Sequence, residues 1–177
     1  MDESSEEIIV LLDACGRRLH ALLTKITANR DAADELLQDL FVRLMKTQAL
    51  NEAPNPEAYL FRSAINLAFD WRKQSSRRSE FTLLDEDLAT EDISPLDRLV
   101  HSETTKQVLY AMDRLSDSDR ELISLRYIQG ETNEWIASRF NLSPHHIRSR
   151  CSKAMAKLRK LISQAEVIPK LRRTDNE

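Results

Sequence analysis

The chain has 177 residues and a formal net charge of −3, with 41% hydrophobic and 31% charged residues. Its two glycines and two cysteines exclude a glycine-rich phosphate loop, a disulfide framework and a Cys-x-x-Cys metal site. The scarcity of glycine and the abundance of Leu, Ala, Glu and Arg predict an all-α fold, and the length suits two small domains. The acidic start does not resemble a signal peptide and no apolar run is long enough to span a membrane, so we expect a cytoplasmic protein with Cys15 and Cys151 as buried thiols.

The N-terminal part of the chain predicts two amphipathic helices. Apolar residues at helical spacing predict a helix over 8–27, and a second helix after Asp31, which we expect to be its N-cap. The apolar face of the second helix is expected to contain Leu36, Leu37, Leu40, Phe41, Leu44 and Met45. Its outer face is expected to present Asp34, Glu35, Gln38, Asp39 and Arg43.

A third helix is predicted after a loop over 47–56. It begins at Pro56, a favourable first helical residue, and runs to about Lys73. Arg62, Asn66 and Asp70 recur every four residues on this helix and form a polar stripe. The stripe indicates either a contact surface or an internal set of hydrogen bonds.

Charge is sorted along the rest of the chain. Between Glu80 and Glu103 there are eight acidic residues and one basic residue, whereas 139–160 contains seven basic residues and no acidic one. We interpret the acidic stretch as a linker with a short helix near 96–100. The expected organisation is therefore a helical domain over 1–78, an acidic linker over 79–103, a second helical domain over 104–165 and a loose tail over 166–177.

The second domain predicts a helix-turn-helix. Ser116 begins one helix that Gly130 ends, Thr132 caps a short helix, Asn141 forms a tight turn, and Ser143 caps the last helix. On a helical wheel the last helix has one apolar side, while the other side carries His145, His146, Ser149, Arg150, Lys153, Lys157 and Lys160. A basic helix after a short helix and a tight turn is typical of proteins that insert the second helix into the major groove of DNA.

Metal binding and catalysis are not expected. His145 and His146 are adjacent and diverge by about 100° around a helix, so they chelate one metal poorly. No Ser/His/Asp or Cys/His set has a spacing that suggests catalysis. We therefore expect no enzyme activity, no metal and no cofactor.

Both halves resemble one known family. Residues 31–44 resemble the polymerase-binding segment of sigma region two, and residues 56–70 resemble the helix that follows it, including Arg62, Asn66 and Asp70. The residues that resemble sigma region four are Leu115, Arg120, Leu125, Arg126, Tyr127, Gly130, Ile136, Ala137 and the stretch 147–150. The chain thus resembles an extracytoplasmic-function (ECF) sigma factor of bacterial RNA polymerase. It departs from the family at Trp135, where Glu is usual, and at the Ser-Pro-His-His start of the last helix.

The resemblance implies partners and site residues. The expected partners are core RNA polymerase, through the beta-prime clamp helices and the beta subunit, promoter DNA, and an anti-sigma factor. The polymerase-binding residues would be Asp34, Glu35, Gln38 and Asp39. The −10 element would be bound by Asn51, Asn55, Asn66, Arg72, Lys73, Arg77 and Arg78. The −35 element would be bound by His145, His146, Arg148, Ser149, Arg150, Lys153 and Lys157.

Two other functions fit parts of the sequence. A regulator with a ligand-sensing N-terminal domain would have the helix-turn-helix, but it has no reason to contain the segments 31–44 and 56–70. A helical enzyme would need a catalytic constellation that the sequence does not suggest.

Overall fold

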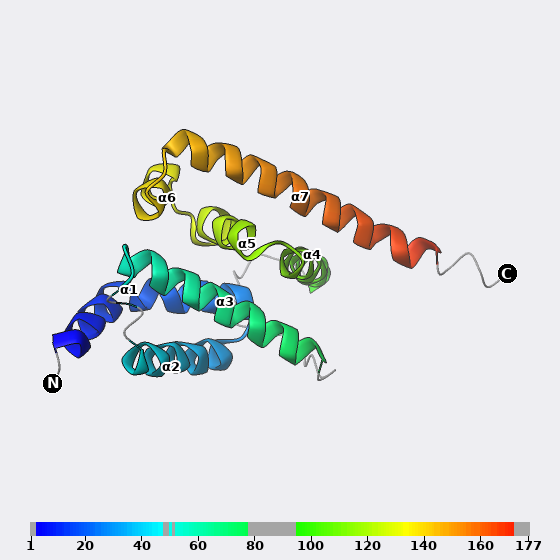
Figure 1. Ribbon diagram of the computed structural model, residues 1–177. Helices are drawn as coiled ribbons and strands as arrows, with labels where there is room; N and C mark the ends of the chain where they lie inside the picture. Colours follow the sequence, from blue (N-terminus) through cyan, green and yellow to red (C-terminus); the bar gives the residue numbers. More distant parts are fainter. Residues whose placement is uncertain (1–2, 48–49, 51, 78–94, 172–177) are drawn as a thin grey trace.

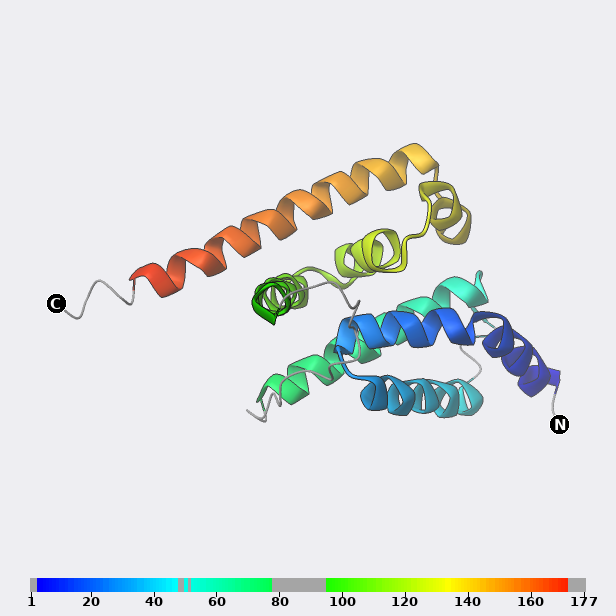
Figure 2. The ribbon, with the colours of Figure 1, turned by 180° about the vertical axis from the view of Figure 1, so that it is seen from behind.

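The computed structural model describes residues 3–47, 50, 52–77 and 95–171. Within them the fold is all-helical, as predicted, and has two layers (Figure 1). The lower layer contains α1 (Glu3–Thr27), α2 (Arg30–Lys46) and α3 (Pro56–Arg77). The upper layer contains α4 (Pro95–Asp113), α5 (Asp117–Ile123), the π-helix η2 (Ser124–Gln129), α6 (Asn133–Phe140) and α7 (Pro144–Leu171). The view from behind confirms that α7 is the outermost helix of the upper layer and α2 lies on the far side of the lower one (Figure 2).

The lower layer is a three-helix unit with an apolar centre. Leu19, Leu22, Leu23 and Ile26 of α1 are fully buried, because their spacing places them on one face of the helix. They pack with α2 and with the aromatic residues of α3, of which Phe61 and Phe69 are also fully buried.

The start of α2 differs from the prediction. Asn29, and not Asp31, is the N-cap, and its side-chain oxygen accepts a hydrogen bond from the Ala32 backbone nitrogen at 2.9 Å. Asp31 lies in the first turn, where a carboxylate is favourable beside the exposed backbone N–H groups. Phe41 and Met45 are exposed, so their assignment to the apolar face of α2 was wrong. Each lies about 100° further around the helix than its buried neighbour, Leu40 or Leu44.

The upper layer confirms the predicted caps. Ser116, Thr132 and Ser143 each accept a backbone hydrogen bond at a helix start, from Asp119, Trp135 and His146 respectively. Gly130 and Asn141 end the preceding helices in the left-handed conformation, with φ of 86° and 52°. The turn at Asn141 places the short helix α6 directly before α7, which is the order of a helix-turn-helix.

Helix α4 differs from the prediction of a short helix near 96–100. It is continuous from Pro95 to Asp113, because no glycine or proline interrupts the sequence after Pro95. The C-terminal part of the segment expected to be a linker is therefore helical. The acidic part over 78–94 and the tail over 172–177 lie outside the described residues.

Candidate nucleic-acid interface

The basic helix α7 is anchored to the upper layer by a narrow apolar stripe. Ile147, Cys151, Ala154 and Leu158 are buried, and they recur every three or four residues on one side of the helix. The side chains between them are thereby divided into two flanks and an outer row. The wheel drawn from the sequence placed members of the outer row together with Arg150 and Lys157, which belong to one flank, on a single polar side.

One flank of α7 faces α5. Arg150 donates a hydrogen bond to the Ser118 hydroxyl, and Lys157 forms an ion pair with Asp119 at 2.6 Å. Burial of Asp119 favours its neutral form, but the hydrogen bonds from Lys157 and Ser116 outweigh it and lower the pKa of the carboxyl. Arg150 and Lys157 therefore have partners within the upper layer, which sequence reasoning did not anticipate.

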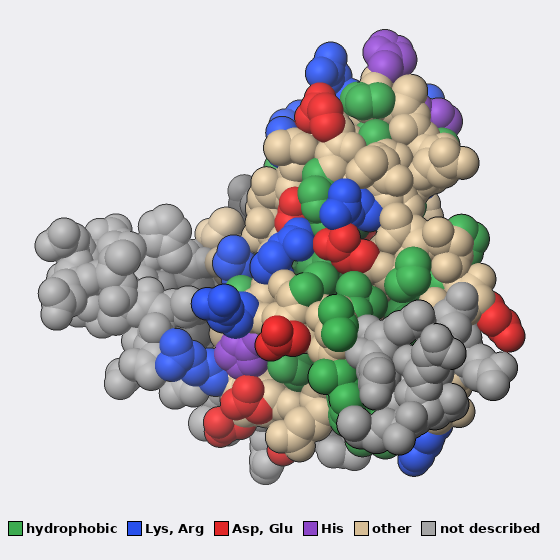
Figure 3. Space-filling model, turned by 90° about the vertical axis from the view of Figure 1, so that its left-hand side faces the viewer, with side chains coloured by type: hydrophobic (Ala, Val, Ile, Leu, Met, Phe, Trp, Pro, Cys, Tyr) green, Lys and Arg blue, Asp and Glu red, His purple; other side chains and the backbone are tan. Residues whose placement is uncertain are grey.

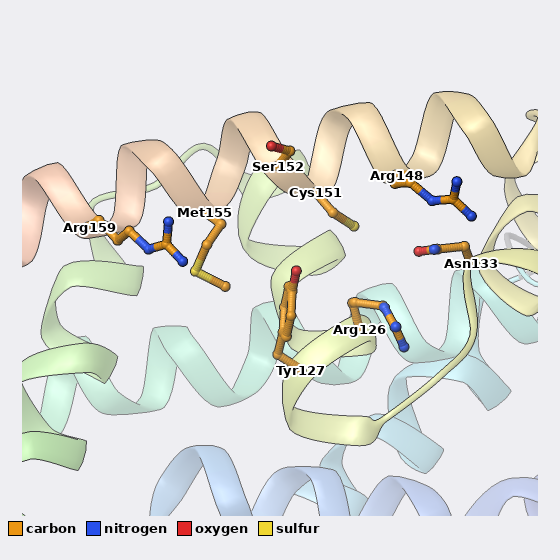
Figure 4. Close-up of a pocket in the computed structure, with 8 residues that line it drawn as sticks. All are labelled: Arg126, Tyr127, Asn133, Arg148, Cys151, Ser152, Met155 and Arg159. Atoms are coloured by element: carbon orange, nitrogen blue, oxygen red, sulfur yellow. The ribbon is translucent and has the colours of Figure 1, made fainter.

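The other flank faces η2 and α6 across a basic hollow. A cavity of about 370 Å³ is lined by Arg126, Tyr127, Asn133, Arg148, Cys151, Ser152, Met155 and Arg159 (Figure 4). Its lining has three guanidinium groups and no carboxylate. Arg126 is held in place because it donates to the Glu131 backbone oxygen at 2.7 Å.

The outer row lies opposite the buried stripe, and one of its members, Ser152, also borders the hollow. Its members are the exposed residues His145, Ser149, Ser152, Lys153, Ala156 and Lys160. The row combines small side chains with two lysines, so it permits close approach of a polyanion along the helix. Ser152 was not among the predicted site residues. A wheel that placed the outer row opposite the buried stripe, at about 180°, could have found it.

The residues predicted to bind the −10 element are not brought together as one patch. The Asn55 amide oxygen caps α3 by accepting from the Ala58 nitrogen at 2.9 Å, and Asn66 accepts from Arg120 of α5 at 3.5 Å. Lys73 is on the surface and pairs with Asp70 at 3.9 Å. Arg77 is the last residue of α3, while Asn51 and Arg78 lie outside the described residues.

The position of Arg72 corrects the expectation that this residue binds the −10 element. Its side chain is only 8% exposed, it donates to the Ile26 backbone oxygen at 3.1 Å, and it faces Asp113 at 4.0 Å. Burial lowers the pKa of Arg72, although Asp113 opposes this effect. The guanidinium therefore joins α3 to α1 and is not presented to phosphate.

The outer face of α2 has a different chemistry. Asp34, Glu35, Gln38 and Asp39 are all exposed, as predicted. Beside them lie the exposed apolar side chains of Phe41, Val42 and Met45. Acidic groups repel nucleic acid, and adjacent exposed apolar side chains are typical of a protein-binding surface.

The described residues offer neither a metal cluster nor a membrane span. No group of three or more potential metal ligands occurs among them. None of the helices over the same residues is both long and apolar enough to cross a bilayer.

Comparison with known proteins shows which family the chain resembles. The family model described as Sigma-70 region 2 matches residues 11–78, and that described as Sigma-70, region 4 matches residues 111–160. The chain is 24% identical over 161 residues to the ECF RNA polymerase sigma factor SigX of Bacillus subtilis, covering 88% of this chain and 83% of that protein. It is also 24% identical over 148 residues to the ECF RNA polymerase sigma factor SigK of Mycobacterium ulcerans, covering 80% of this chain and 78% of that protein.

Among solved structures, CnrH in complex with the cytosolic domain of CnrY is similar at 22% identity, with a TM-score of 0.47 and coverage of 92% of this chain and 91% of that one. The two family models match the two halves of this chain in order, and the second contains the helix-turn-helix. The chain belongs to the ECF sigma factors of the sigma-70 family, which are not enzymes but subunits that bind RNA polymerase and promoter DNA to initiate transcription.

Proposed function

We propose that this sigma factor, acting in the cytoplasm, reads the −35 element with the outer row of α7. The exposed row of small residues and lysines is the observation that carries this proposal. His145, Ser149 and Lys153 lie near the N-terminal end of α7, which in helix-turn-helix proteins reaches base edges in the major groove. His146 is exposed beside them and extends the same surface.

The two flanks of α7 are assigned to the DNA backbone. Arg148 and Arg159 border the basic hollow and suit phosphate groups on one side of the groove. Arg150 and Lys157 border the opposite side, and their bonds to Ser118 and Asp119 fix where their positive charge lies. Arg150 is therefore a better candidate for a phosphate contact than for a base contact, in contrast to the expectation from sequence.

The −10 element is assigned to α3 and the loop before it. Asn66 offers a polar amide on the stripe, and Lys73 and Arg77 supply positive charge toward the end of the helix. Asn51 and Asn55 complete the proposed site. The oxygen of Asn55 is used in the cap, so its amide nitrogen is the group available to a base.

The outer face of α2 is assigned to the polymerase. Its acidic residues Asp34, Glu35 and Asp39 flank an apolar patch, which suits a protein surface with basic and apolar groups. By family resemblance that surface is the clamp helices of the beta-prime subunit. Reversing the charge of Glu35 and Asp39 is expected to weaken binding to core polymerase.

Transcription by core polymerase on a promoter library tests the function as a whole. The wild-type chain is expected to enrich a defined set of promoters, and failure to stimulate initiation on any promoter would overturn it. Duplexes of the enriched −35 sequence and its single-base variants then test the division of α7. We expect Lys153→Ala to lose about 1–3 kcal/mol at one position only. Arg150→Ala is expected to weaken all duplexes alike and to reduce the salt slope by about 1. Equal losses on every duplex for both variants would contradict the division.

A further inference from the structure

The flank of α7 that faces α5 is held by that helix at two places. Arg150 donates a hydrogen bond to the Ser118 hydroxyl, and the Lys157 ammonium lies 2.6 Å from a carboxylate oxygen of Asp119. Arg150 and Lys157 are seven residues apart in the sequence, so they lie on the same side of α7, about two turns from each other. The first turn of α5 therefore supplies one acceptor for each cation of this flank.

Asp119 is fixed in place by the start of α5. Ser116 caps this helix, and its hydroxyl accepts from the Asp119 backbone nitrogen at 3.3 Å. The Asp119 side chain is 14% exposed, whereas that of Lys157 is 63% exposed. Lys157 is therefore the member of the pair that DNA can reach, and the carboxylate behind it determines where its charge lies.

The two flanks of α7 differ in how freely their charges can move. Acidic side chains lie directly beside basic ones on the end of the molecule where α7 begins (Figure 3), so the basic groups do not form an uninterrupted surface. On the flank facing the hollow, Arg148 and Arg159 line a cavity without a carboxylate, and neither forms an ion pair with a described residue. On the flank facing α5, Lys157 can move only by breaking a charge-assisted hydrogen bond.

We propose that Asp119 is a positioning residue for DNA binding, which makes the phosphate contact of Lys157 depend on where the protein sits along the DNA. The proposal rests on the proposed function, in which α7 reads the −35 element and Lys157 contacts the DNA backbone. Its consequence is that Asp119 weakens binding to unrelated DNA more than it weakens binding to the −35 sequence.

This dependence follows from the chemistry of a held lysine. An ammonium group has three donors, so Lys157 can contact a phosphate without leaving Asp119 if the phosphate lies where the ammonium is held. When α7 is seated on its own −35 sequence, the base contacts fix one position of the backbone relative to Lys157. On unrelated DNA the protein binds at many positions and slides between them, so Lys157 must leave Asp119 to reach most phosphates.

A lysine without such a partner makes no distinction between positions on DNA. Its long, flexible side chain reaches a phosphate wherever the protein binds. The bond that Lys157 must break is an exposed ion pair, which corresponds to a factor of about 1.5–5 in an equilibrium constant. This factor sets the size of the effect that we expect from removing Asp119.

Asp119→Asn tests the proposal in the full chain. Asparagine is nearly the size of aspartate and keeps the backbone nitrogen that Ser116 caps, but it cannot form an ion pair. Binding is measured by fluorescence anisotropy at several salt concentrations. The probes are a labelled duplex of the −35 sequence enriched from the promoter library and a labelled duplex of random sequence.

The random duplex is expected to show the larger change. Asp119→Asn is expected to bind it about threefold more tightly, with a salt slope steeper by about 0.9, because the released lysine neutralises one further phosphate. The −35 duplex is expected to gain less, so the ratio of the two affinities falls. Equal gains on the two duplexes, or no gain on the random duplex, would overturn the proposal.

Asp117→Asn is the matched control, because it removes the same charge from the same turn of α5. Asp117 is 78% exposed and pairs with Arg120 of its own helix at 2.7 Å. This variant is expected to leave both affinities unchanged, since salt screens an exposed charge that contacts neither α7 nor DNA. A gain as large as that of Asp119→Asn would show that the loss of any acidic charge suffices, and the role of Asp119 would be overturned.

A double variant shows whether Asp119 acts through Lys157. In a Lys157→Gln background, Asp119→Asn is expected to change neither the affinity nor the salt slope on the random duplex. If it still tightens binding threefold, Asp119 acts by repelling phosphate directly, and positioning through Lys157 is overturned. Circular dichroism establishes that each variant is folded, and Asp119→Ser replaces Asp119→Asn if the latter is not.

Failure of the proposed function is recognised separately. A wild-type chain that binds the −35 and random duplexes equally well overturns the assignment of α7 to the −35 element. The random duplex still decides whether Asp119 restrains Lys157, because the comparison of Asp119→Asn with its control and its double variant needs no sequence preference.

Discussion

The interior of the lower layer and the contact surface between the two layers are held together by different chemistry. We call this contact surface the seam; it contains the pairs Arg62–Glu121, Arg139–Glu57 and Phe61–Trp135. Leu19, Leu22, Leu23 and Ile26 are fully buried in the interior and carry no polar side-chain atoms. The seam instead has charged side chains around one aromatic pair, and in its ion pair of Arg62 with Glu121 the arginine is half exposed. Burying apolar surface is strongly favourable, whereas a buried ion pair gains little after its desolvation. We therefore expect the seam to be the weaker of the two contacts.

The largest effect is expected from a substitution in the interior, and a substitution in the seam is its reference. Leu22→Ala removes a fully buried side chain from α1 and is expected to lower the free energy of unfolding by about 2–5 kcal/mol. Denaturant titration of the full chain measures this loss. Trp135→Ala, measured in the same way, is expected to cost less than Leu22→Ala, because its ring lies between the layers. Equal losses would contradict the distinction between interior and seam.

The next effect concerns the turn that carries two contacts of the seam. Gly130 has a φ of 86°, between Ile128, whose oxygen accepts from Lys25 at 3.0 Å, and Glu131, which accepts from Arg18. Gly130→Ala is expected to cost about 1–2 kcal/mol, since a Cβ disfavours the left-handed conformation. The other glycine supplies the control: Gly16 lies inside α1 with no atom within 4 Å of an added Cβ. Gly16→Ala is expected to raise stability by about 0.5–1 kcal/mol. Thermal unfolding of both proteins checks the opposite signs, and the same sign for both would contradict the role of the turn.

Acid is expected to tighten the seam. Burial raises the pKa of Glu121 above its ordinary 4.5, although Arg62 and Arg150 oppose it, and burial likewise raises the pKa of Asp113. Opening hydrates these carboxyl groups, so the closed state binds protons more tightly than the open state. The resulting stabilisation of the closed seam is complete below the ordinary pKa of these carboxyl groups. It is lost as the pH rises through their raised pKa values. A Trp71→Phe protein retains Trp135 as its one tryptophan. Quenching of Trp135 by acrylamide in this protein is therefore expected to decrease as the pH falls through the raised pKa values toward the ordinary ones.

The acid effect has a matched control. Glu121→Gln is expected to reduce the pH dependence of quenching, whereas Glu134→Gln, at an exposed carboxyl of α6, is expected to leave it unchanged. Stronger quenching on acidification would mean that the ionised carboxylates hold the seam together, and would contradict the expected tightening.

Local features were predictable from the sequence, but contacts across the layers were not. Ser116, Thr132, Ser143, Gly130 and Asn141 were identified because caps and left-handed turns depend on neighbouring residues. The stripe of Arg62, Asn66 and Asp70 was visible as either a contact surface or an internal set of hydrogen bonds. The partners of Arg62 and Asn66 are more than fifty positions away, and no periodicity encodes them. The burial of Arg72 was missed for the same reason, since a basic run gives no sign of Ile26 or Asp113.

The smallest expected effect tests whether a contact is weak simply because it is formed by charged groups. Asp119 and Lys157 form an ion pair like those of the seam, but they lie within the upper layer, between α5 and α7. The Lys157 side chain is 63% exposed, so solvent screens the pair, and Lys157→Gln is expected to cost about 0.5 kcal/mol. The lowered pKa of Asp119 means that this contribution is present above the ordinary pKa of 3.8 and is lost as the pH falls through the lowered value.

The control for Lys157 is Lys153, an exposed lysine four residues earlier, which has no ion pair with any described residue. Lys153→Gln is expected to leave the unfolding free energy unchanged but to weaken −35 binding, whereas Lys157→Gln is expected to affect both. Denaturant titrations at low and high salt measure the stability difference, which should shrink with salt because the pair is exposed. A loss for Lys157→Gln as large as that for Leu22→Ala would show that a charged contact inside a layer is as strong as its apolar interior. The seam would then be weak because it lies between two layers, and not because its contacts are charged.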